Sequence, residues 1–340
     1  MSLIISLKKT TTLVACGILL WTAAPLSAQQ EVGPSAEIDA AKEAFIEELA
    51  TNHNIDPQRI RDVLANAERN EDVLGAIQRP WEARPWYRYH GIFLTDRRIE
   101  RGVEFWKTHQ ETLQRAADEY GVPAQVIVAI IGVETFYGEY MGNYRVLDAL
   151  YSLGFYYPPR QSFFRSELAE FIRLAENEKL DTFAVKGSYA GAMGFGQFIS
   201  SSYRAYAVDF DDDGQRDLLN NKVDAIGSVA NYFARHQWRK GQQVAIPAWP
   251  NRVSDIDALT SGRGQVLTHT VGSLREAGVD FVTQMPEDTP ARLFKFEEEE
   301  GASYWVGFPN FYSITRYNHS PLYAMAVYLL SEEIRHAFER

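Results

Sequence analysis

Apolar side chains recur at three- and four-residue intervals through most of the chain, which is the spacing of helices with one buried face. Residues 240–300 break this period with prolines, glycines and short alternating stretches, which indicate loops, short helices and a small sheet. We therefore predict a mainly α fold (α+β), a helical core with small additional lobes. The predicted helices cover about 38–70, 96–120, 123–134, 160–177, 223–236 and the C-terminal stretch from Ser320.

Proline and small polar residues mark where several of these helices begin. Pro57 suits a first helical turn, and Ser320 followed by Pro321 is a good cap with proline at the first position. Two prolines close together in residues 79–87 exclude a long helix there. The acidic run 296–300 indicates a solvated edge or loop.

The helix at 123–134 differs from the others because its residues 126–133 are apolar on every side up to Glu134. Such a segment is buried all round, and burying a carboxylate away from water is costly unless it has partners or is protonated. A carboxyl that stays protonated near neutral pH is what a general acid requires. The alternative is a structural glutamate satisfied by arginine or backbone groups.

The N-terminus carries an export signal pattern. Lys8 and Lys9 precede an apolar stretch, and Ala28 provides a small residue for cleavage, so we predict a signal peptide over 1–28 and a linker over 29–37. Cys16 lies in a lipobox-like context, and a lipid anchor there is the alternative to cleavage after Ala28. We expect a periplasmic protein.

Charge and cysteine content exclude several classes of function. Without the two signal lysines, 32 basic residues face 45 acidic ones, a net charge of −13. This argues against nucleic acid or anionic membranes as partners. Cys16 is the only cysteine, which excludes internal disulfides, thiol catalysis and cysteine metal clusters in the mature chain. Aromatic residues make up 13% of the chain, and sugar-binding sites use aromatic ring faces.

A glycine-rich run spans residues 187–198 and lacks the Gly-Lys-Ser or Gly-Lys-Thr ending of a phosphate-binding loop. Its glycines would let the backbone approach a ligand closely, while Ser188 and Gln197 offer hydrogen bonds. Tight helix packing is the alternative explanation for the glycines.

Residues 209–220 follow the calcium-loop pattern of an EF-hand. Asn220 stands where a bidentate glutamate normally closes such a site, and Asp224 is an uncertain substitute. We expect a structural calcium site, or a sodium site, and no cofactor for the chemistry; a solvated acidic turn is the alternative. The predicted ligands are the side chains of Asp209, Asp211, Asp213 and Asp217 and the backbone carbonyl of Gln215.

Four segments together resemble the B-type membrane-bound lytic murein transglycosylases, glycoside hydrolase family 103. They are residues 131–135, 187–198, 224–233 and 309–320, in this order. The resemblance implies a catalytic region over 38–340, with a lysozyme-like core at about 96–240 plus 301–340, and a metal loop at 209–220. It also implies that Glu134 is the single catalytic acid/base.

The same resemblance implies a set of substrate contacts. One departure is Pro159, which replaces one of two arginines that relatives carry beside Arg160 and puts recognition of the peptide stem on that side in doubt. The implied contacts are Ser188, Gln197, Tyr232, Arg160, Tyr312, Tyr317 and Asn318.

The expected activity is cleavage of the MurNAc–GlcNAc β-1,4 bond of peptidoglycan to give 1,6-anhydro-MurNAc ends. Ordinary glycosidases need two carboxyl groups, whereas here the muramoyl 6-hydroxyl would replace the second one by acting as the nucleophile. The alternatives are a muramidase that hydrolyses the same bond and a non-catalytic peptidoglycan-binding scaffold. We expect glycan strands as the main partner, cell-wall synthesis or remodelling proteins as further candidates, and a monomer.

Overall fold

The computed structural model describes residues 34–79, 84–261 and 266–340. The predicted signal peptide (1–28) and Cys16 lie outside the described residues. Residues 80–83 of the proline-rich segment lie outside them as well. The predicted linker (29–37) is wrong at its C-terminal end, because helix α1 (Pro34–His53) already begins at Pro34.

The described chain is mainly helical, as predicted, with small sheets. Ser320 caps the last helix, where its Oγ accepts a hydrogen bond from the Tyr323 N–H at 3.4 Å, and Asp56 caps the helix that begins at Pro57. Besides α1, the helices are α2 (Pro57–Ala65), α3 (Glu71–Ala76), α4 (Trp86–Phe93), α5 (Asp96–Thr108), α6 (Gln110–Tyr120), α7 (Ala124–Thr135), α8 (Val146–Tyr156), η2 (Pro158–Arg160), α9 (Gln161–Asn177), α10 (Ser200–Tyr206), α11 (Lys222–Arg235), α12 (Ile256–Thr260), α13 (Val271–Glu276), α14 (Pro309–Tyr317) and α15 (Pro321–Phe338).

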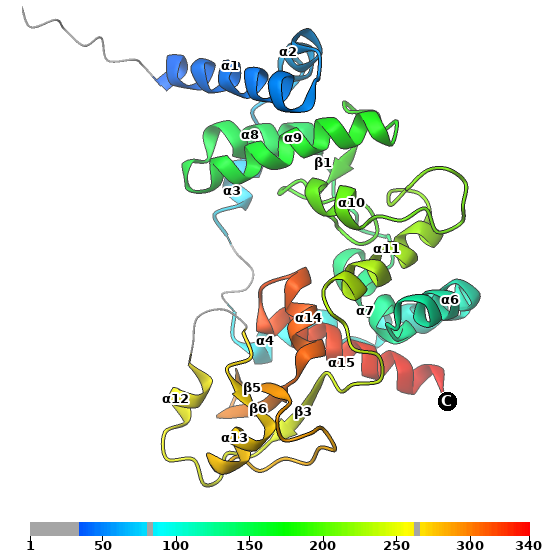
Figure 1. The fold of residues 1–340 in the computed structure, drawn as a ribbon, viewed down its shortest axis with the longest axis vertical. Helices are drawn as coiled ribbons and strands as arrows, with labels where there is room; N and C mark the ends of the chain where they lie inside the picture. Colours follow the sequence, from blue (N-terminus) through cyan, green and yellow to red (C-terminus); the bar gives the residue numbers. More distant parts are fainter. Residues whose placement is uncertain (1–33, 80–83, 262–265) are drawn as a thin grey trace, which may run out of the picture.

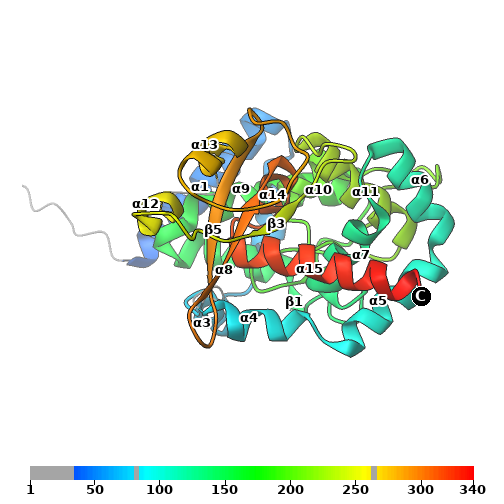
Figure 2. The same ribbon diagram turned by 90° about the horizontal axis from the view of Figure 1, so that it is seen from below.

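These elements form three levels along the long axis of the molecule (Figure 1). Helices α1, α2, α8 and α9 lie at one end, and α6, α7, α11, α14 and α15 form the middle. Strands β3 (Ala245–Ala248), β5 (Pro290–Glu297) and β6 (Ala302–Gly307) form a lobe at the other end together with α12 and α13. This lobe is nearest the viewer in Figure 2. Residues from the beginning and the end of the chain therefore meet in the middle level.

The predicted helix over 96–120 is wrong as a single element, because it is broken at His109 between α5 and α6. Neither proline nor glycine marks this break in the sequence. The two halves pack against different neighbours: α5 lies on α15, and α6 lies on α11. Tertiary packing thus bends a segment whose local pattern is continuous.

Helix α7 is the centre of the larger hydrophobic core. It starts after Pro123 and packs against α15, α5, α11 and α6. All residues from Val126 to Gly132 are buried, which confirms the prediction made from its unbroken apolar pattern.

The small sheet predicted within 240–300 is present and extends further along the chain. Its strands are β3 (Ala245–Ala248), β4 (His269–Thr270), β5 (Pro290–Glu297) and β6 (Ala302–Gly307), antiparallel in the order β3-β6-β5-β4. Because β6 belongs to this sheet, the helical core does not begin at residue 301 as expected but at α14. The short pair β1 (Tyr144–Arg145) and β2 (Lys186–Gly187) stands apart from this sheet.

Strand β5 joins the sheet to the helices. Leu293 lies in the small core of the β lobe, whereas Phe294 and Phe296 lie in the large helical core. Successive side chains of a strand point to opposite faces, so both faces of β5 are covered. The run at 296–300 is solvated only after Phe296, which is buried.

Membrane-spanning helices were sought among the described residues. No single helix there is long and apolar enough to cross a bilayer, although α6 and α7 reach the required composition together as a pair bent by 113°.

Candidate active site

Glu134 occupies the penultimate position of α7, where the buried helix ends. Three consecutive residues after Thr135 have positive φ angles: Phe136 at 52°, Tyr137 at 62° and Gly138 at 96°. Left-handed conformations in non-glycine residues are strained and persist where the surroundings enforce them. The chain therefore turns sharply away from the helix and leaves the Glu134 side chain at its end.

The carboxyl of Glu134 has one hydrogen-bonding partner recorded among the described residues. The Tyr323 hydroxyl donates to its Oε1 at 2.5 Å, from the first turn of α15. The residue as a whole keeps some exposure, but loss of hydration around the carboxyl raises its pKa to about 7, and the Tyr323 hydrogen bond opposes this rise. A pKa near neutrality is the property that a general acid needs.

The charge of Glu134 changes the pKa values of two nearby tyrosines. Burial first, and then the carboxylate of Glu134, raises the pKa of both Tyr317 and Tyr323 well above its ordinary value. Both hydroxyls therefore stay protonated and can act as donors. Within the described ranges, no charged residue contributes to the pKa shift of Glu134 itself, so the site holds a single carboxyl surrounded by neutral hydroxyl groups.

The glycine-rich run lies directly against the end of α7. Thr135 Oγ1 donates to the carbonyl of Phe195 at 2.9 Å, and a Cβ on Gly138 would stand 2.2 Å from the ring of Phe195. On its other side, the Phe195 N–H donates to the carbonyl of Leu218 at 3.1 Å. The backbone of the run is thus fixed between α7 and the acidic loop.

Ser188 and Gln197 sit at the two ends of this run and hold its turns. Ser188 Oγ accepts hydrogen bonds from the N–H groups of Ala190 and Ala192 at 3.2 and 3.1 Å. Gln197 adopts φ +49°, and its Nε2 donates to the carbonyls of Met141 and Gly194 at 3.1 and 3.0 Å. Within the ranges that the structure describes, the amide oxygen of Gln197 and the hydroxyl hydrogen of Ser188 take part in none of these hydrogen bonds.

Tyr232 and Tyr317 support the site through their hydroxyls, which both donate to backbone carbonyls. Tyr317 donates to Gly196 at 2.6 Å, and Tyr232 donates to Arg316 at 2.5 Å. Their rings lie 4.7 Å apart in an edge-to-face contact. These two residues hold the glycine-rich run against α14.

The other three predicted contacts lie around this cluster in different ways. Asn318 Oδ1 accepts from the Ser320 N–H at 3.1 Å, which orders the start of α15 and so the position of Tyr323. Tyr312 lines a cavity of about 240 Å³ together with His236 and Arg239. Arg160 is exposed, with its guanidinium 4.4 Å from the ring of Phe163, and no recorded contact joins it to the Glu134 cluster within the described chain.

Sequence reasoning missed Tyr323 and the role of Thr135. A signal for Tyr323 exists, because it is a polar-tipped aromatic in the otherwise apolar first turns of the last helix. A buried tyrosine hydroxyl usually needs a partner, but the sequence does not reveal which one. Tyr89, from α4, also raises the pKa of Tyr323 through a charge interaction, so it is part of the environment of this hydroxyl.

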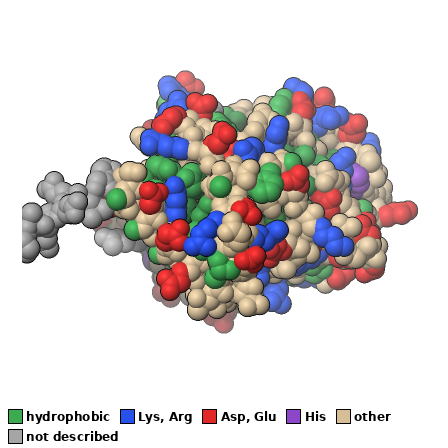
Figure 3. Space-filling view, turned by 90° about the horizontal axis from the view of Figure 1, so that it is seen from above, with side chains coloured by type: hydrophobic (Ala, Val, Ile, Leu, Met, Phe, Trp, Pro, Cys, Tyr) green, Lys and Arg blue, Asp and Glu red, His purple; other side chains and the backbone are tan. Residues whose placement is uncertain are grey.

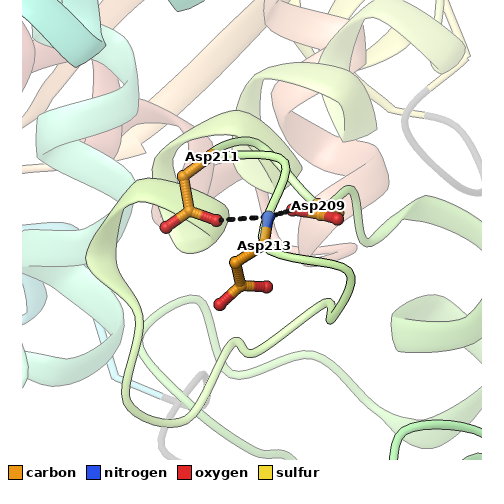
Figure 4. A group of neighbouring side chains, drawn as sticks. All are labelled: Asp209, Asp211 and Asp213. Carbon is orange, nitrogen blue, oxygen red and sulfur yellow. Dashed lines mark hydrogen bonds between the residues drawn. The ribbon is translucent and has the colours of Figure 1, made fainter.

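The acidic loop brings three of its predicted ligands together. Carboxylate oxygens of Asp209, Asp211 and Asp213 all lie within 4.8 Å of one another. Figure 4 shows the three side chains together on the loop. The loop turns back on itself through the Asp213 N–H, which donates to Asp209 Oδ1 at 3.0 Å and to Asp211 Oδ1 at 3.3 Å. Hard oxygen ligands of this kind suit calcium.

The second half of the loop differs from the expected pattern. Asp217 Oδ1 accepts from the N–H groups of Leu219 and Asn220 at 2.9 and 3.0 Å, so its carboxylate lies outside the three-aspartate group. Asp224 does not replace the missing glutamate, because its two oxygens accept from the N–H groups of Phe210 and Asp217 at 2.7 and 2.8 Å.

Comparison with known proteins identifies relatives along almost the whole described chain. Residues 37–332 match the family described as "Transglycosylase SLT domain". The membrane-bound lytic murein transglycosylase B of Escherichia coli (strain K12) is 42% identical over 306 residues, which cover 85% of this chain and 81% of that protein.

Two solved structures extend this similarity to the fold. The soluble lytic transglycosylase SltB1 of Pseudomonas aeruginosa is 45% identical, with a TM-score of 0.83 over 88% of this chain and 100% of that chain. The Escherichia coli lytic transglycosylase Slt35 in complex with calcium is 41% identical, with a TM-score of 0.77 over 88% of this chain and 94% of that chain.

Proposed function

Because the chain belongs to the transglycosylase SLT family and is a peptidoglycan lytic transglycosylase with that family's lysozyme-like fold, we propose that Glu134 is its single catalytic acid/base. The observation that carries this proposal is the Glu134 carboxyl itself. It ends a buried helix, its pKa is raised to about 7, and its recorded partner is the Tyr323 hydroxyl.

The proposed reaction needs one carboxyl in two protonation states. Protonated Glu134 donates to the oxygen that bridges N-acetylmuramic acid and N-acetylglucosamine, and this glycosidic bond breaks. The substrate's own N-acetyl group stabilises the positive charge that develops at the sugar carbon. Ionised Glu134 then takes the proton of the muramoyl 6-hydroxyl as that oxygen attacks the carbon. A 1,6-anhydro sugar forms without water.

Tyr323 has a defined part in this cycle. A hydroxyl that donates a hydrogen bond to a carboxylate lowers the pKa of that carboxyl group. The hydrogen bond from Tyr323 therefore limits the rise in the pKa of Glu134 that burial causes, and Glu134 stays acidic enough to give up its proton. Ser188 and Gln197 are the proposed sugar contacts, since each keeps a hydrogen-bonding atom that no other residue of the described chain engages. Tyr232, Tyr317 and Asn318 act by positioning the loop and α15, and Tyr312 and Arg160 are proposed to contact more distant parts of the substrate.

Digestion of purified sacculi followed by mass spectrometry tests the reaction type. A transglycosylase releases muropeptides that are lighter by one water than the hydrolytic products. Reducing ends would instead establish a muramidase, and release of no fragments would leave only a binding scaffold.

Substitution tests the assignment of Glu134. We expect Glu134→Gln to lower activity by about 10³-fold or more, because an amide cannot donate and then accept this proton. Glu139→Gln is the matched control. Glu139 lies five residues after Glu134, but it is exposed and forms an ion pair with Arg97. Full activity in Glu134→Gln would overturn the proposal.

We further propose that the loop at 209–220 binds calcium through Asp209, Asp211 and Asp213, with the carbonyl of Gln215 as an additional ligand. Asp217, which lies outside the three-aspartate group, would reach the ion through a water molecule, as the ninth loop position often does. The three-aspartate group and the calcium complex of Slt35 support this. The ion would have a structural role, because Leu218 of the same loop accepts a hydrogen bond from the glycine-rich run. Sodium is the alternative occupant.

Calorimetric titration and thermal unfolding test this site. Calcium should bind with measurable heat and raise the Tm of the wild type, and Asp211→Asn should abolish both effects. Asp212→Asn removes the same charge outside the three-aspartate group and should keep them. An unchanged Tm for the wild type, or sodium giving the same effect as calcium, would contradict a calcium site.

Peptidoglycan lies outside the cytoplasmic membrane, so this substrate requires export. We propose that residues 1–28 direct the chain to the periplasm and are removed, and that a monomer acts on glycan strands. Lipid attachment at Cys16 is the alternative. Mass spectrometry of the purified mature protein separates them, because cleavage after Ala28 leaves no cysteine.

A further inference from the structure

Arg98 of α5 is a charged residue that the reaction described above does not use. Its neighbours Arg97 and Arg101 form surface ion pairs with Glu139 and Glu104, and acidic and basic side chains are mixed in the same way on the face in Figure 3. Arg98 is instead half-buried, has no ion pair within the described ranges, and its pKa is lowered by burial. A buried charge is costly unless it is hydrogen-bonded, so its partners are informative.

The guanidinium of Arg98 binds the C-terminal ends of two helices. Its Nε donates to the carbonyl of Gly132 in the last turn of α7 at 3.2 Å, and its Nη1 donates to the carbonyl of Ile92 near the end of α4. The last carbonyls of a helix lack partners within it, and the negative end of the helix dipole favours a cation. One side chain therefore satisfies both helix ends, and Gly132 lies only two positions before Glu134.

Arg98 also contacts both non-glycine residues of the left-handed turn behind Glu134. Its guanidinium lies 4.9 Å from the ring of Phe136, a cation–π distance. Its backbone carbonyl accepts a hydrogen bond from the Tyr137 hydroxyl at 2.8 Å. A Cβ on Gly132 would stand 2.6 Å from that hydroxyl, so the Tyr137 side chain folds back tightly against α7.

These contacts matter because the turn is strained. Left-handed backbone in two successive residues with side chains is unfavourable, and it relaxes unless the surroundings enforce it. Relaxation would unwind the last turn of α7 and move the carboxyl of Glu134 away from Tyr323. Among the described groups, the charge of Arg98 is not a cause of the pKa shift of Glu134, so Arg98 can affect this carboxyl only through geometry.

We propose that Arg98 is a positioning residue for the reaction. It locks the turn at Phe136 and Tyr137 and thereby fixes where α7 presents the carboxyl of Glu134. This proposal rests on the proposed function, since it assigns a support to the same acid/base.

Arg98→Lys tests the proposal while keeping the charge at both helix ends, so that the chain stays folded. An ammonium lacks the planar fork of a guanidinium and cannot hold two carbonyls while lying on a ring. We expect kcat on soluble peptidoglycan strands to fall at least about tenfold, because a misplaced catalytic group can cost ~10²-fold. KM should stay within about twofold of the wild type, which marks an interaction that serves the transition state.

The same variant should change the acidity of Glu134. A carboxyl released from the end of α7 gains water, so its pKa should fall from about 7 toward its ordinary value of 4.5. The basic limb of the kcat/KM profile should then move to lower pH. NMR titration of protein with isotope-labelled glutamate carboxyls measures this pKa without turnover, and the spectrum of Glu134→Gln assigns the signal.

Arg97→Lys is the matched control. The guanidinium of Arg97 also lies 4.9 Å from the ring of Phe136, but Arg97 is exposed and bonds to Glu139 in place of a helix carbonyl. Its kcat, its basic limb and the pKa of Glu134 should match the wild type.

Wild-type kcat in Arg98→Lys, an unmoved titration of Glu134, or equal losses in Arg97→Lys would each overturn the positioning role. These outcomes are distinct from failure of the proposed function, which would appear as full activity in Glu134→Gln.

Discussion

The acidity of Glu134 results from two opposing effects on one carboxyl group. Loss of hydration at the end of α7 raises its pKa, and the hydrogen bond from Tyr323 lowers it, with a result of about 7. The first effect comes from a helix in the first half of the chain and the second from the last helix. The pKa is therefore sensitive to how these helices pack.

Removal of the Tyr323 hydroxyl should change the pH dependence of the enzyme. Tyr323→Phe deletes the interaction that favours the ionised carboxyl, so the pKa of Glu134 rises further. Because the reaction begins with protonated Glu134, the basic limb of the kcat/KM profile should move to higher pH. We expect kcat to fall about tenfold as the carboxyl loses its positioning contact.

Tyr328→Phe is the control for this change. Tyr328 lies on the same helix, and its hydroxyl donates to the carbonyl of Ala245 at 3.0 Å instead of to Glu134. The basic limb of the kcat/KM profile of Tyr328→Phe should therefore stay at the pH of the wild type. A basic limb that stays in place or moves to lower pH in Tyr323→Phe would contradict the assigned role.

The raised pKa of Glu134 also has a cost in stability. The carboxyl of the unfolded chain ionises from about pH 4.5, whereas the folded chain keeps its proton up to about pH 7. The unfolded state therefore binds fewer protons in this window, and stability falls as the pH rises through it. Glu134→Gln, which cannot ionise, should match the wild type near pH 4 and exceed it by up to roughly 3 kcal/mol near pH 8.

Urea unfolding at both pH values measures this difference, and Glu139→Gln should show no such gain because Glu139 is exposed. Equal stability of Glu134→Gln and the wild type at both pH values would mean that the carboxyl is well hydrated in the folded state.

At the scale of elements, the site depends on the close approach of three backbones: the end of α7, the glycine-rich run and the acidic loop. Gly194 shows how tight this approach is. It has φ +70°, and a Cβ there would lie 2.1 Å from the carbonyl oxygen of Leu218. Only glycine is compatible with both the conformation and the contact.

Comparing Gly194→Ala with Gly241→Ala separates the cost of the left-handed backbone conformation from the cost of the close contact. Gly241 has φ +75° but nothing within 4 Å of its added Cβ, so its substitution should cost about 1 kcal/mol of unfolding free energy through conformation alone. Gly194→Ala should cost roughly 3 kcal/mol or more and should reduce activity, because the run must move away from Leu218. Chemical denaturation compares the two variants, and equal costs would show that the run adapts easily.

At the scale of the whole molecule, β5 connects two hydrophobic cores. Phe294 and Phe296 reach the helical core, where their rings lie 4.6 Å from Phe311 and 5.2 Å from Trp86, respectively. Leu293 lies in the core of the β lobe. A strand covered on both faces makes the unfolding of one core depend on the other.

Truncation on the helical face of β5 should uncouple the cores. Phe294→Ala should lower the unfolding free energy by about 3–5 kcal/mol, and calorimetry should then resolve a β-lobe transition before that of the helices. Lys295→Ala, the exposed neighbour, should stay within about 0.5 kcal/mol of the wild type. A single transition in Phe294→Ala would show that other contacts couple the two cores.

The sequence determined the features that depend on local pattern. The unbroken apolar run predicted the burial of α7 and singled out Glu134, and the cap at Ser320 and Pro321 predicted the start of α15. The aspartate spacing predicted the three-aspartate group. These features are local because side-chain periodicity, capping and loop spacing act over a few residues.

Only the tertiary structure decided which distant groups meet. It broke the predicted helix at His109, placed Tyr323 on the carboxyl of Glu134, and turned Asp224 toward backbone N–H groups. Such contacts depend on how whole helices pack, and the periodicity of a single helix does not specify its partner across 189 residues of chain.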